Sequence, residues 1–132
     1  MRNFYIASSF RNIDAVRYVS ERLVTEGFIQ LYDWTKNAIA HDAETFTLQD
    51  LQYIGQKEKQ AVFDADIVIV ILPGGKGTHV ELGIALGCGK RIILYAADGE
   101  INNPAASSTF YHLPEVEKCQ GTLDDLLDMV TA

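Results

Sequence analysis

The chain has 132 residues, a length that suits one hydrophobic core, and we expect a single domain over residues 1–132. Hydrophobic residues make up 48% of the chain, but no stretch has the length of a membrane span and the N-terminus lacks a secretory signal, so a cytoplasmic protein without membrane contact is expected. The net charge of −7 disfavours binding to a nucleic acid polymer, although a local cluster of donors could still hold one small phosphate.

The pattern along the chain alternates between segments typical of strands and segments typical of helices. The expected strands span residues 3–7, 28–32, 67–72 and 91–95, with a fifth near residue 117. The expected helices span residues 15–24, 47–65 with Thr47 as cap and Asp50 three residues on, 78 onward, and 123–130. Residues 33–42 are mostly polar, which predicts a loop over the ligand site.

The strongest segment is the run of six apolar residues from Ile67 to Leu72, which lacks alternation and is therefore expected to be a strand buried on both faces. Alternating strands and helices predict an α/β fold, a three-layer flavodoxin-like or Rossmann-like domain with a five-stranded, mostly parallel sheet. In such sheets a ligand binds beyond the carboxyl ends of the strands, where the strand order reverses.

A glycine-rich loop follows this central strand and leads into a helix. Its glycines, Gly74, Gly75 and Gly77, let the backbone approach a ligand closely, and the helix start near Thr78 offers free N–H groups to phosphate or sugar hydroxyls. The spacing is not that of a P-loop. The alternative interpretation is an ordinary tight turn.

Glu81 is the central candidate for chemistry. Thr78-x-x-Glu81 has the spacing of a capping box, so one interpretation is a purely structural carboxylate. The other places Glu81 in the first helical turn at the mouth of the sheet, within reach of a ligand's sugar. There the helix N-terminus is expected to keep it ionised, as a nucleophile requires.

Polar residues in and after the first strand could complete the site. Ser8, Ser9 and Arg11 offer hydroxyls and a guanidinium to a phosphate, although Arg11 could equally be a surface arginine. The hydroxyl of Tyr5 could reach a catalytic carboxylate, or Tyr5 could be a core residue.

Three further residues are candidates for contacts with a planar base. Asp33 and Trp34, at the mouth of the second strand, could hydrogen-bond and stack a base. Glu58 falls on the apolar stripe of its helix, so it either faces the site, where it could bind a base or hold a proton, or lies solvated at the margin of the stripe. No His/Cys cluster has the spacing of metal ligands, and no metal or cofactor is predicted.

Two segments carry a resemblance to a known family. Residues 4–11 and 64–87 resemble the nucleoside 2-deoxyribosyltransferases and their relatives that hydrolyse 2′-deoxynucleoside 5′-phosphates. The resemblance implies that Tyr5 is the active-site tyrosine, that Ser9-Phe10-Arg11 is the Ser-x-Arg of the phosphate-using relatives, and that Glu81 is the nucleophile. By the same register Glu58 matches an aspartate that helps bind the base.

The loop carries a second resemblance. Pro73-Gly74-Gly75-Lys76-Gly77-Thr78-His79-Val80-Glu81 is similar to the P-G-G-x-G-T-x-x-E motif of the lysine-decarboxylase-like phosphoribohydrolases, whose further upstream glycine-rich segment this chain lacks. The loop is also shorter than in typical deoxyribosyltransferases, and an acidic base-binding residue expected there has no match.

Together these observations predict cleavage of the N-glycosidic bond of a (deoxy)nucleoside or its 5′-monophosphate, by transfer to another base or to water. The alternatives are a non-catalytic domain that binds or senses a nucleotide, and a phosphoribohydrolase acting on a nucleoside 5′-monophosphate. The resemblance also implies that the chain forms a homodimer or a higher homo-oligomer.

Overall fold

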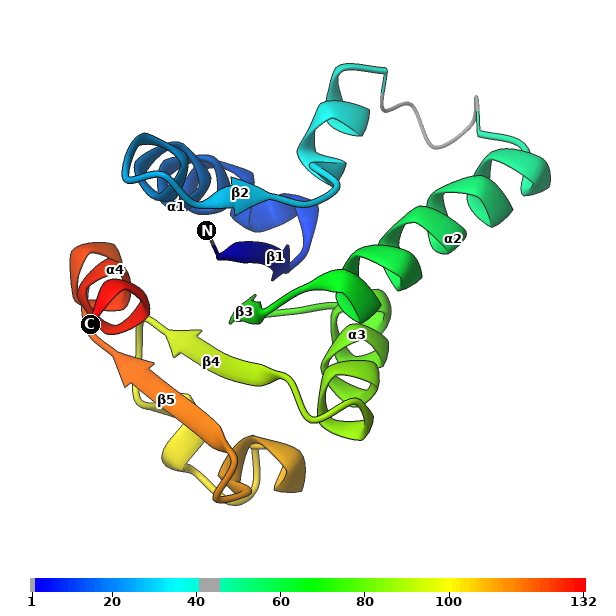
Figure 1. Ribbon diagram of the computed structural model, residues 1–132. Helices are drawn as coiled ribbons and strands as arrows, with labels where there is room; N and C mark the ends of the chain where they lie inside the picture. The colour runs from blue at the N-terminus through cyan, green and yellow to red at the C-terminus, as the bar shows by residue number, and fades with distance from the viewer. Residues whose placement is uncertain (1, 41–45) are drawn as a thin grey trace.

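The computed structural model describes residues 2–40 and 46–132, in which five parallel strands form one sheet. The strand order is β2-β1-β3-β4-β5, the flavodoxin-like order expected from the sequence, and every neighbouring pair is parallel (Figure 1). The strands are β1 (Asn3–Ala7), β2 (Ile29–Gln30), β3 (Ile67–Ile71), β4 (Arg91–Ala96) and β5 (Val116–Gln120).

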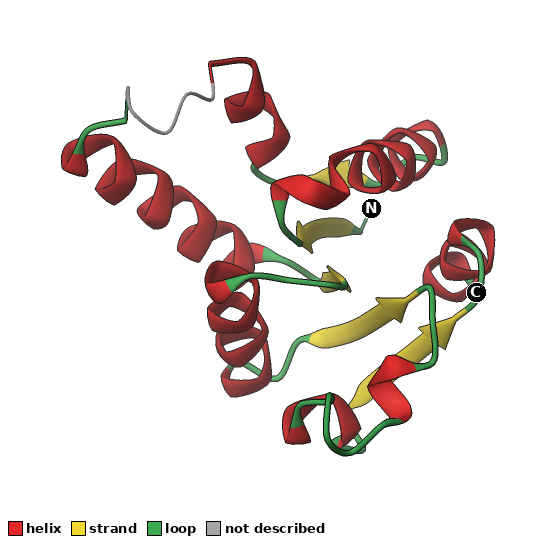
Figure 2. Cartoon of the chain, turned by 180° about the vertical axis from the view of Figure 1, so that it is seen from behind, coloured by secondary structure: helices red, strands yellow, loops and turns green. Residues whose placement is uncertain are grey.

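Helices cover both faces of this sheet. They are α1 (Ile13–Thr25), α2 (Leu48–Asp64), α3 (Lys76–Gly87) and α4 (Leu123–Thr131), with short 3-10 helices η1 (Phe10–Asn12), η2 (Trp34–Ala40), η3 (Glu100–Asn102) and η4 (Thr109–His112). The pairs α1 and α4 lie on one face and α2 and α3 on the other, as both ribbon views show (Figures 1 and 2). The predicted three-layer α/β class is confirmed.

The central strand is as buried as its sequence predicts. Every residue of β3 is buried, and the strand lies between β1 and β4 in the middle of the sheet. A strand covered on both faces has no side for polar residues, which explains the unbroken apolar run. Parallel pairing places the carboxyl ends of β1 and β3 side by side, where Ala7 pairs with Val70.

Three predicted boundaries are wrong in detail. The third long helix begins at Lys76 rather than at residue 78, because Gly75 serves as its N-cap. The second strand is only two residues long, Ile29–Gln30, since it pairs with β1 alone at the edge of the sheet. Part of the predicted loop over residues 33–42 forms η2, and residues 41 and 42 lie outside the described residues.

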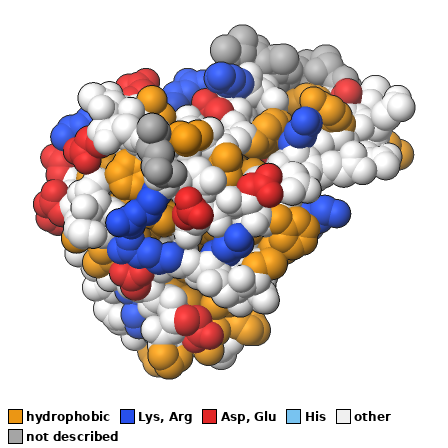
Figure 3. All heavy atoms as spheres, in the orientation of Figure 1, with side chains coloured by type: hydrophobic (Ala, Val, Ile, Leu, Met, Phe, Trp, Pro, Cys, Tyr) orange, Lys and Arg blue, Asp and Glu red, His pale blue; other side chains and the backbone are white. Residues whose placement is uncertain are grey.

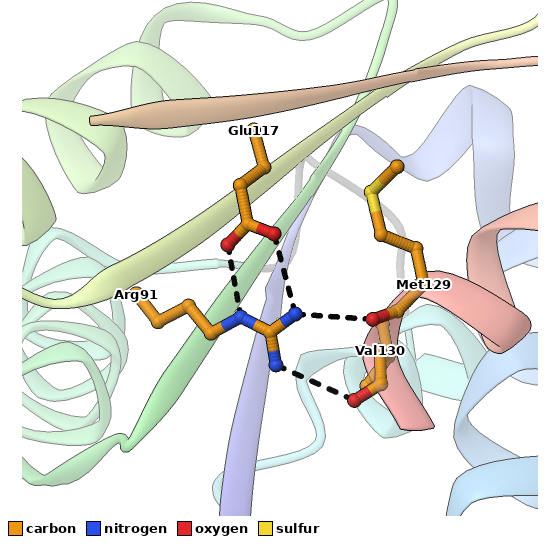
Figure 4. A network of polar contacts seen from close by, with 4 residues as sticks. All are labelled: Arg91, Glu117, Met129 and Val130. Atoms are coloured by element: carbon orange, nitrogen blue, oxygen red, sulfur yellow. Dashed lines mark hydrogen bonds and ion pairs between the residues drawn. The ribbon is translucent and has the colours of Figure 1, made fainter. Parts of the chain in front are cut away.

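At the amino end of β4, Arg91 joins three elements (Figure 4). Its guanidinium donates to both carboxylate oxygens of Glu117 on β5, at 2.9 and 3.3 Å, and to the carbonyls of Met129 and Val130 at the end of α4, at 3.0 and 3.4 Å. The last carbonyls of a helix lack partners within the helix, and Arg91 satisfies two of them. This contact therefore holds α4 against the sheet at the edge opposite the ligand side.

Among the described residues, no helix is both long enough and apolar enough to cross a membrane.

Candidate active site

A pocket opens at the carboxyl ends of β1 and β3, where the predicted site residues were expected to gather. Its volume is about 500 Å³, within the usual range for a small-molecule site. The lining residues come from the segments after β1 and β3, from η2, from the residues before α2, and from α2 and α3: Ser8, Ser9, Phe10, Trp34, Asn37, Phe46, Leu51, Ile54, Glu58, Gly75, Gly77, Thr78 and Glu81.

Glu81 of α3 lies at the base of this pocket and is only 6% exposed. The hydroxyl of Tyr5, which is fully buried on β1, donates a short hydrogen bond to the Glu81 carboxylate. The same hydroxyl lies 3.4 Å from a carboxylate oxygen of Glu58, on α2. Two carboxyl groups from different helices thus meet at one phenol: the Tyr5 hydroxyl reaches a carboxylate, and Glu58 lines the pocket.

Burial controls the protonation of this cluster. It raises the pKa of Glu81 to about 8, against the opposing effect of the hydrogen bond from Tyr5, and the negative charge of Glu58 raises it further. Burial likewise raises the pKa of Glu58, again opposed by Tyr5. Burial, followed by the two carboxylates, raises the pKa of Tyr5 far above its ordinary value, so the phenol remains a neutral donor.

The expectation that the helix N-terminus keeps Glu81 ionised is therefore wrong. Because α3 begins at Lys76, Glu81 lies in the second turn rather than the first. The field of the helix dipole fades within the first turn. Burial of the Glu81 carboxylate, which disfavours its charged form, therefore determines the direction of the pKa shift.

The capping box predicted between Thr78 and Glu81 is also wrong. The hydroxyl of Thr78 accepts a hydrogen bond from the backbone N–H of Gly75 at 3.1 Å, while the Glu81 carboxylate is bound by Tyr5. Thr78 is buried against the loop, and a Cβ at Gly74 would lie 2.5 Å from its methyl carbon. The glycine at position 74 is thus required by the close approach of Thr78.

Polar side chains after β1 tie this segment to the glycine-rich loop. Ser8 Oγ donates to the carbonyl of Ile71 at 2.7 Å, and Ser9 Oγ donates to the carbonyl of Pro73 at 3.3 Å. The amide of Asn12 donates to the same Pro73 carbonyl at 2.7 Å. Both serines line the pocket as predicted, whereas the bracing role of Asn12 gave no signal in the sequence beyond its place after a strand.

Trp34 and its neighbours form an apolar wall. The indole N–H of Trp34 donates to the carbonyl of Ile6 at 2.7 Å, and the ring meets Phe10 edge to face with centroids 5.3 Å apart. Leu51 and Ile54 of α2 add to the wall. Asn37, which sequence reasoning missed because it lies in the presumed loop, also lines the pocket and donates from its amide to the hydroxyl of Tyr32 at 3.0 Å.

Four predicted residues do not line the pocket. Tyr5 is fully buried and contacts the lining residues Glu81 and Glu58, and Gly74 lines a separate hollow with His79 and Tyr111. Asp33 lines a separate surface hollow, and its carboxylate accepts from the backbone N–H of Thr35 at 3.0 Å and from the Thr35 hydroxyl, so it caps the start of η2. Arg11 is exposed on η1 and is not among the residues that line the pocket.

Within the part of the chain that the structure describes, no three His, Cys, Asp or Glu side chains are grouped so that they could hold a metal ion.

Comparison with known proteins gives structural matches alone. No family model and no curated protein matches the chain. The solved structures that share its fold include two enzymes and one conserved protein. The CMP N-glycosidase BcmB of Clostridium botulinum has a TM-score of 0.64 at 14% identity, over 99% of this chain and 100% of that one. A conserved protein of Enterococcus faecalis V583 has a TM-score of 0.68 at 17% identity, over 99% and 98%.

The third is a 2-deoxyribosyltransferase from Bacillus psychrosaccharolyticus, with a TM-score of 0.64 at 19% identity, over 96% of this chain and 90% of that one. At these identities the likeness concerns the fold. The resemblance to the nucleoside 2-deoxyribosyltransferase family stated from the sequence is thus confirmed at that level: the chain has the fold that this N-glycosidase and this 2-deoxyribosyltransferase share.

Proposed function

We propose that this chain cleaves the N-glycosidic bond of a (deoxy)nucleoside or its 5′-monophosphate and transfers the sugar to water or to another base, with Glu81 as nucleophile. The observation that carries the proposal is the buried Tyr5–Glu81 hydrogen bond with Glu58 at the same hydroxyl, at the base of a ligand-sized pocket. The named activities of two proteins with the same fold support it.

The shape and lining of the pocket suit a flat base joined to a polar sugar. Trp34, Phe10 and Ile54 offer apolar surface of the kind on which a planar ring packs. Across the pocket, the start of α3 presents backbone N–H groups at Gly77 and Thr78 beside Glu81. Free N–H groups at a helix start hold sugar hydroxyls or a phosphate.

The chemistry follows the retaining glycosidases, in which a pair of carboxyl groups flanks the bond to be broken. Burial gives Glu81 a pKa of about 8, so the step uses the fraction of the enzyme in which Glu81 is ionised. An oxygen of that carboxylate forms a bond to C1′ while the bond from C1′ to the base nitrogen breaks, and the electron pair leaves with the base. Glu58 is placed to bind that base or to give it a proton. Water or a second base then attacks C1′, which frees the Glu81 carboxylate.

Tyr5 contributes as an orienting donor in this scheme. Its hydroxyl fixes one oxygen of Glu81, so the other is directed at the sugar. A hydrogen bond to the charged form of a carboxylate also favours that form against burial, as the pKa contributions at Glu81 show.

The experiment is release of free base from a panel of nucleosides and their 5′-monophosphates, with and without an acceptor base. It compares the wild type with Glu81→Gln and with the exposed control Glu115→Gln. Base release by the wild type and the control, and a loss of at least about 10³-fold in Glu81→Gln, is the expected result. Dependence on the acceptor separates transferase from hydrolase.

The same panel tests whether Arg11 reaches a 5′-phosphate from the rim of the pocket. Arg11→Ala should then weaken monophosphates about tenfold or more and leave nucleosides unchanged, whereas Arg2→Ala, at the other end of β1, should affect neither. Nucleotide binding without any base release, equal in wild type and Glu81→Gln, would instead support the non-catalytic binding domain.

A further inference from the structure

His79 of α3 lies between the glycine-rich loop and η4, and both of its ring nitrogens have partners. Nδ1 is 2.8 Å from the carbonyl of Gly75, and Nε2 is 2.5 Å from the hydroxyl of Tyr111. A carbonyl can only accept, so Nδ1 carries a proton and donates to Gly75, while Nε2 and the Tyr111 hydroxyl share the second hydrogen bond. The two rings also stack, with centroids 5.8 Å apart and planes at 27°.

The carbonyl that His79 holds belongs to the N-cap of α3. It also accepts from the backbone N–H of His79 at 3.3 Å, so one side chain and one amide of the same residue fix it. The Gly75–Lys76 peptide is trans and planar, so its N–H points opposite to the held carbonyl. Fixing the carbonyl therefore also fixes the direction of the first free N–H group of the helix.

Glycine cannot provide this restraint by itself. Gly75 has open space where a Cβ would stand, and among the described residues two side chains hydrogen-bond its backbone, those of His79 and Thr78. A glycine peptide with few contacts samples many conformations. Tyr111, by contrast, is buried, and with His79 it lines a hollow of about 200 Å³ that also borders Pro73 and Gly74.

We propose that His79, held by Tyr111, is a positioning residue that sets the orientation of the Gly75–Lys76 peptide, and with it the start of α3, whose next two amide groups, at Gly77 and Thr78, face the sugar or phosphate in the pocket beside Glu81. The proposal rests on the proposed function for its effect on catalysis. It makes the segment between β4 and β5, which supplies Tyr111, a part of the support of the site.

The test uses two readouts on the full chain, of which the first does not depend on activity. Amide hydrogen exchange at Gly75 and His79 is measured by NMR in the wild type, His79→Ala, His79→Asn, His79→Gln and Tyr111→Phe. Glu21→Gln, at an exposed residue of α1 on the other face of the sheet, is the control. Base release gives kcat and KM for the same proteins.

Exchange at Gly75 and His79 should accelerate about tenfold in His79→Ala, the effect of about one hydrogen bond. The amide nitrogen of asparagine stands where Nδ1 stood, so His79→Asn should restore protection, whereas His79→Gln should not. In the active enzyme His79→Ala should raise KM more than it lowers kcat, and Tyr111→Phe should have a smaller effect in the same direction.

Unchanged exchange in His79→Ala, or equal exchange in His79→Ala and His79→Asn, would overturn the positioning role. A wild type that releases no base while these exchange differences persist would overturn the proposed function and leave the positioning of the loop supported. The two failures are thus distinguishable.

Discussion

At the scale of single residues, the site depends on a phenol that two carboxyl groups share. Tyr5 is in the middle of a buried strand, and its hydroxyl reaches Glu81 and Glu58 because α3 and α2 cover that face of the sheet. The sequence could identify all three residues, through the resemblance of their motifs. It could not give the protonation of Glu81, because that depends on burial by segments far away in the chain.

The raised pKa of Glu81 has a consequence for stability. Between about pH 4.5 and pH 8 the folded chain keeps a proton that the unfolded chain releases, so the contribution is complete below that window and is lost as the pH rises through it. The free energy of unfolding should fall by up to about 1.4 kcal/mol per pH unit from this group. Glu81→Gln cannot ionise at this position, so its free energy of unfolding should not show this part of the decrease with pH.

Urea unfolding at pH 5.5, 7.0 and 8.5 measures this difference. The stability of Glu81→Gln relative to the wild type should increase steadily with pH, while Glu115→Gln, an exposed carboxylate, should follow the wild type. Parallel pH dependences for the wild type and Glu81→Gln would show that burial does not hold a proton on Glu81.

At the scale of elements, the predicted strands and helices agree best with the structure where burial is complete. The run Ile67–Ile71 is a strand in the sheet centre, and the capping box from Thr47 to Asp50 begins α2 as predicted. The sequence predicts the start of α3 two residues too late, because glycine is a weak helix former and Gly77 gives no sign of a helix. Gly75 is the N-cap of this helix, and its N–H donates to the hydroxyl of Thr78.

The contact of Arg91 with α4 provides a test at this scale. Arg91→Met should lower the free energy of unfolding by about 1 kcal/mol, because the carbonyls of Met129 and Val130 lose their donor. The ion pair with Glu117 adds little to this loss, since both side chains are partly exposed. Arg91→Lys should recover less than half, since an ammonium cannot match the planar fork. Urea unfolding measures both.

Base release provides the control for the same variants. Arg91 begins β4, whereas Glu81 lies beyond the carboxyl ends of the strands, so KM and kcat should remain at the wild-type values below the unfolding transition. A loss of activity in a fully folded Arg91→Met would contradict the separation of this contact from the site.

At the scale of the whole molecule, the three-layer class, the strand order and most of the pocket lining could be predicted from the sequence. They follow from the alternation of elements and from rules for parallel sheets. The placement of Asp33 could not be predicted, because a carboxylate after a strand can either bind a ligand or cap the next turn. In the structure the Asp33 carboxylate accepts a hydrogen bond from the backbone N–H of Thr35. Asn37 lines the pocket as part of η2, and a polar composition alone does not predict that short helix.

The surface carries apolar side chains that a single chain leaves uncovered. Basic, acidic and hydrophobic side chains are interspersed on the face in Figure 3. Leu48 and Tyr53 on α2 are 85% and 59% exposed, and Val80 on α3, which packs beside α2, is 62% exposed. Exposed apolar surface of this kind favours association, so we predict the homo-oligomer that the sequence also led us to expect.

Sedimentation velocity over a range of concentrations measures this association. The double variant Leu48→Glu and Tyr53→Glu should sediment as a monomer, whereas Val24→Glu, on α1 at the other face of the sheet, should sediment as the wild type does. A wild type that remains monomeric at the highest concentration would contradict the prediction.

The most direct test of Glu81 as nucleophile is the mass of the chain after it has reacted with a nucleoside that carries fluorine at C2′, which slows the second step. Our account predicts a chain heavier by one sugar, with the added mass on the peptide that contains Glu81, and no added mass in Glu81→Gln. Complete release of the base without any added mass, or a sugar attached to another residue, would contradict it.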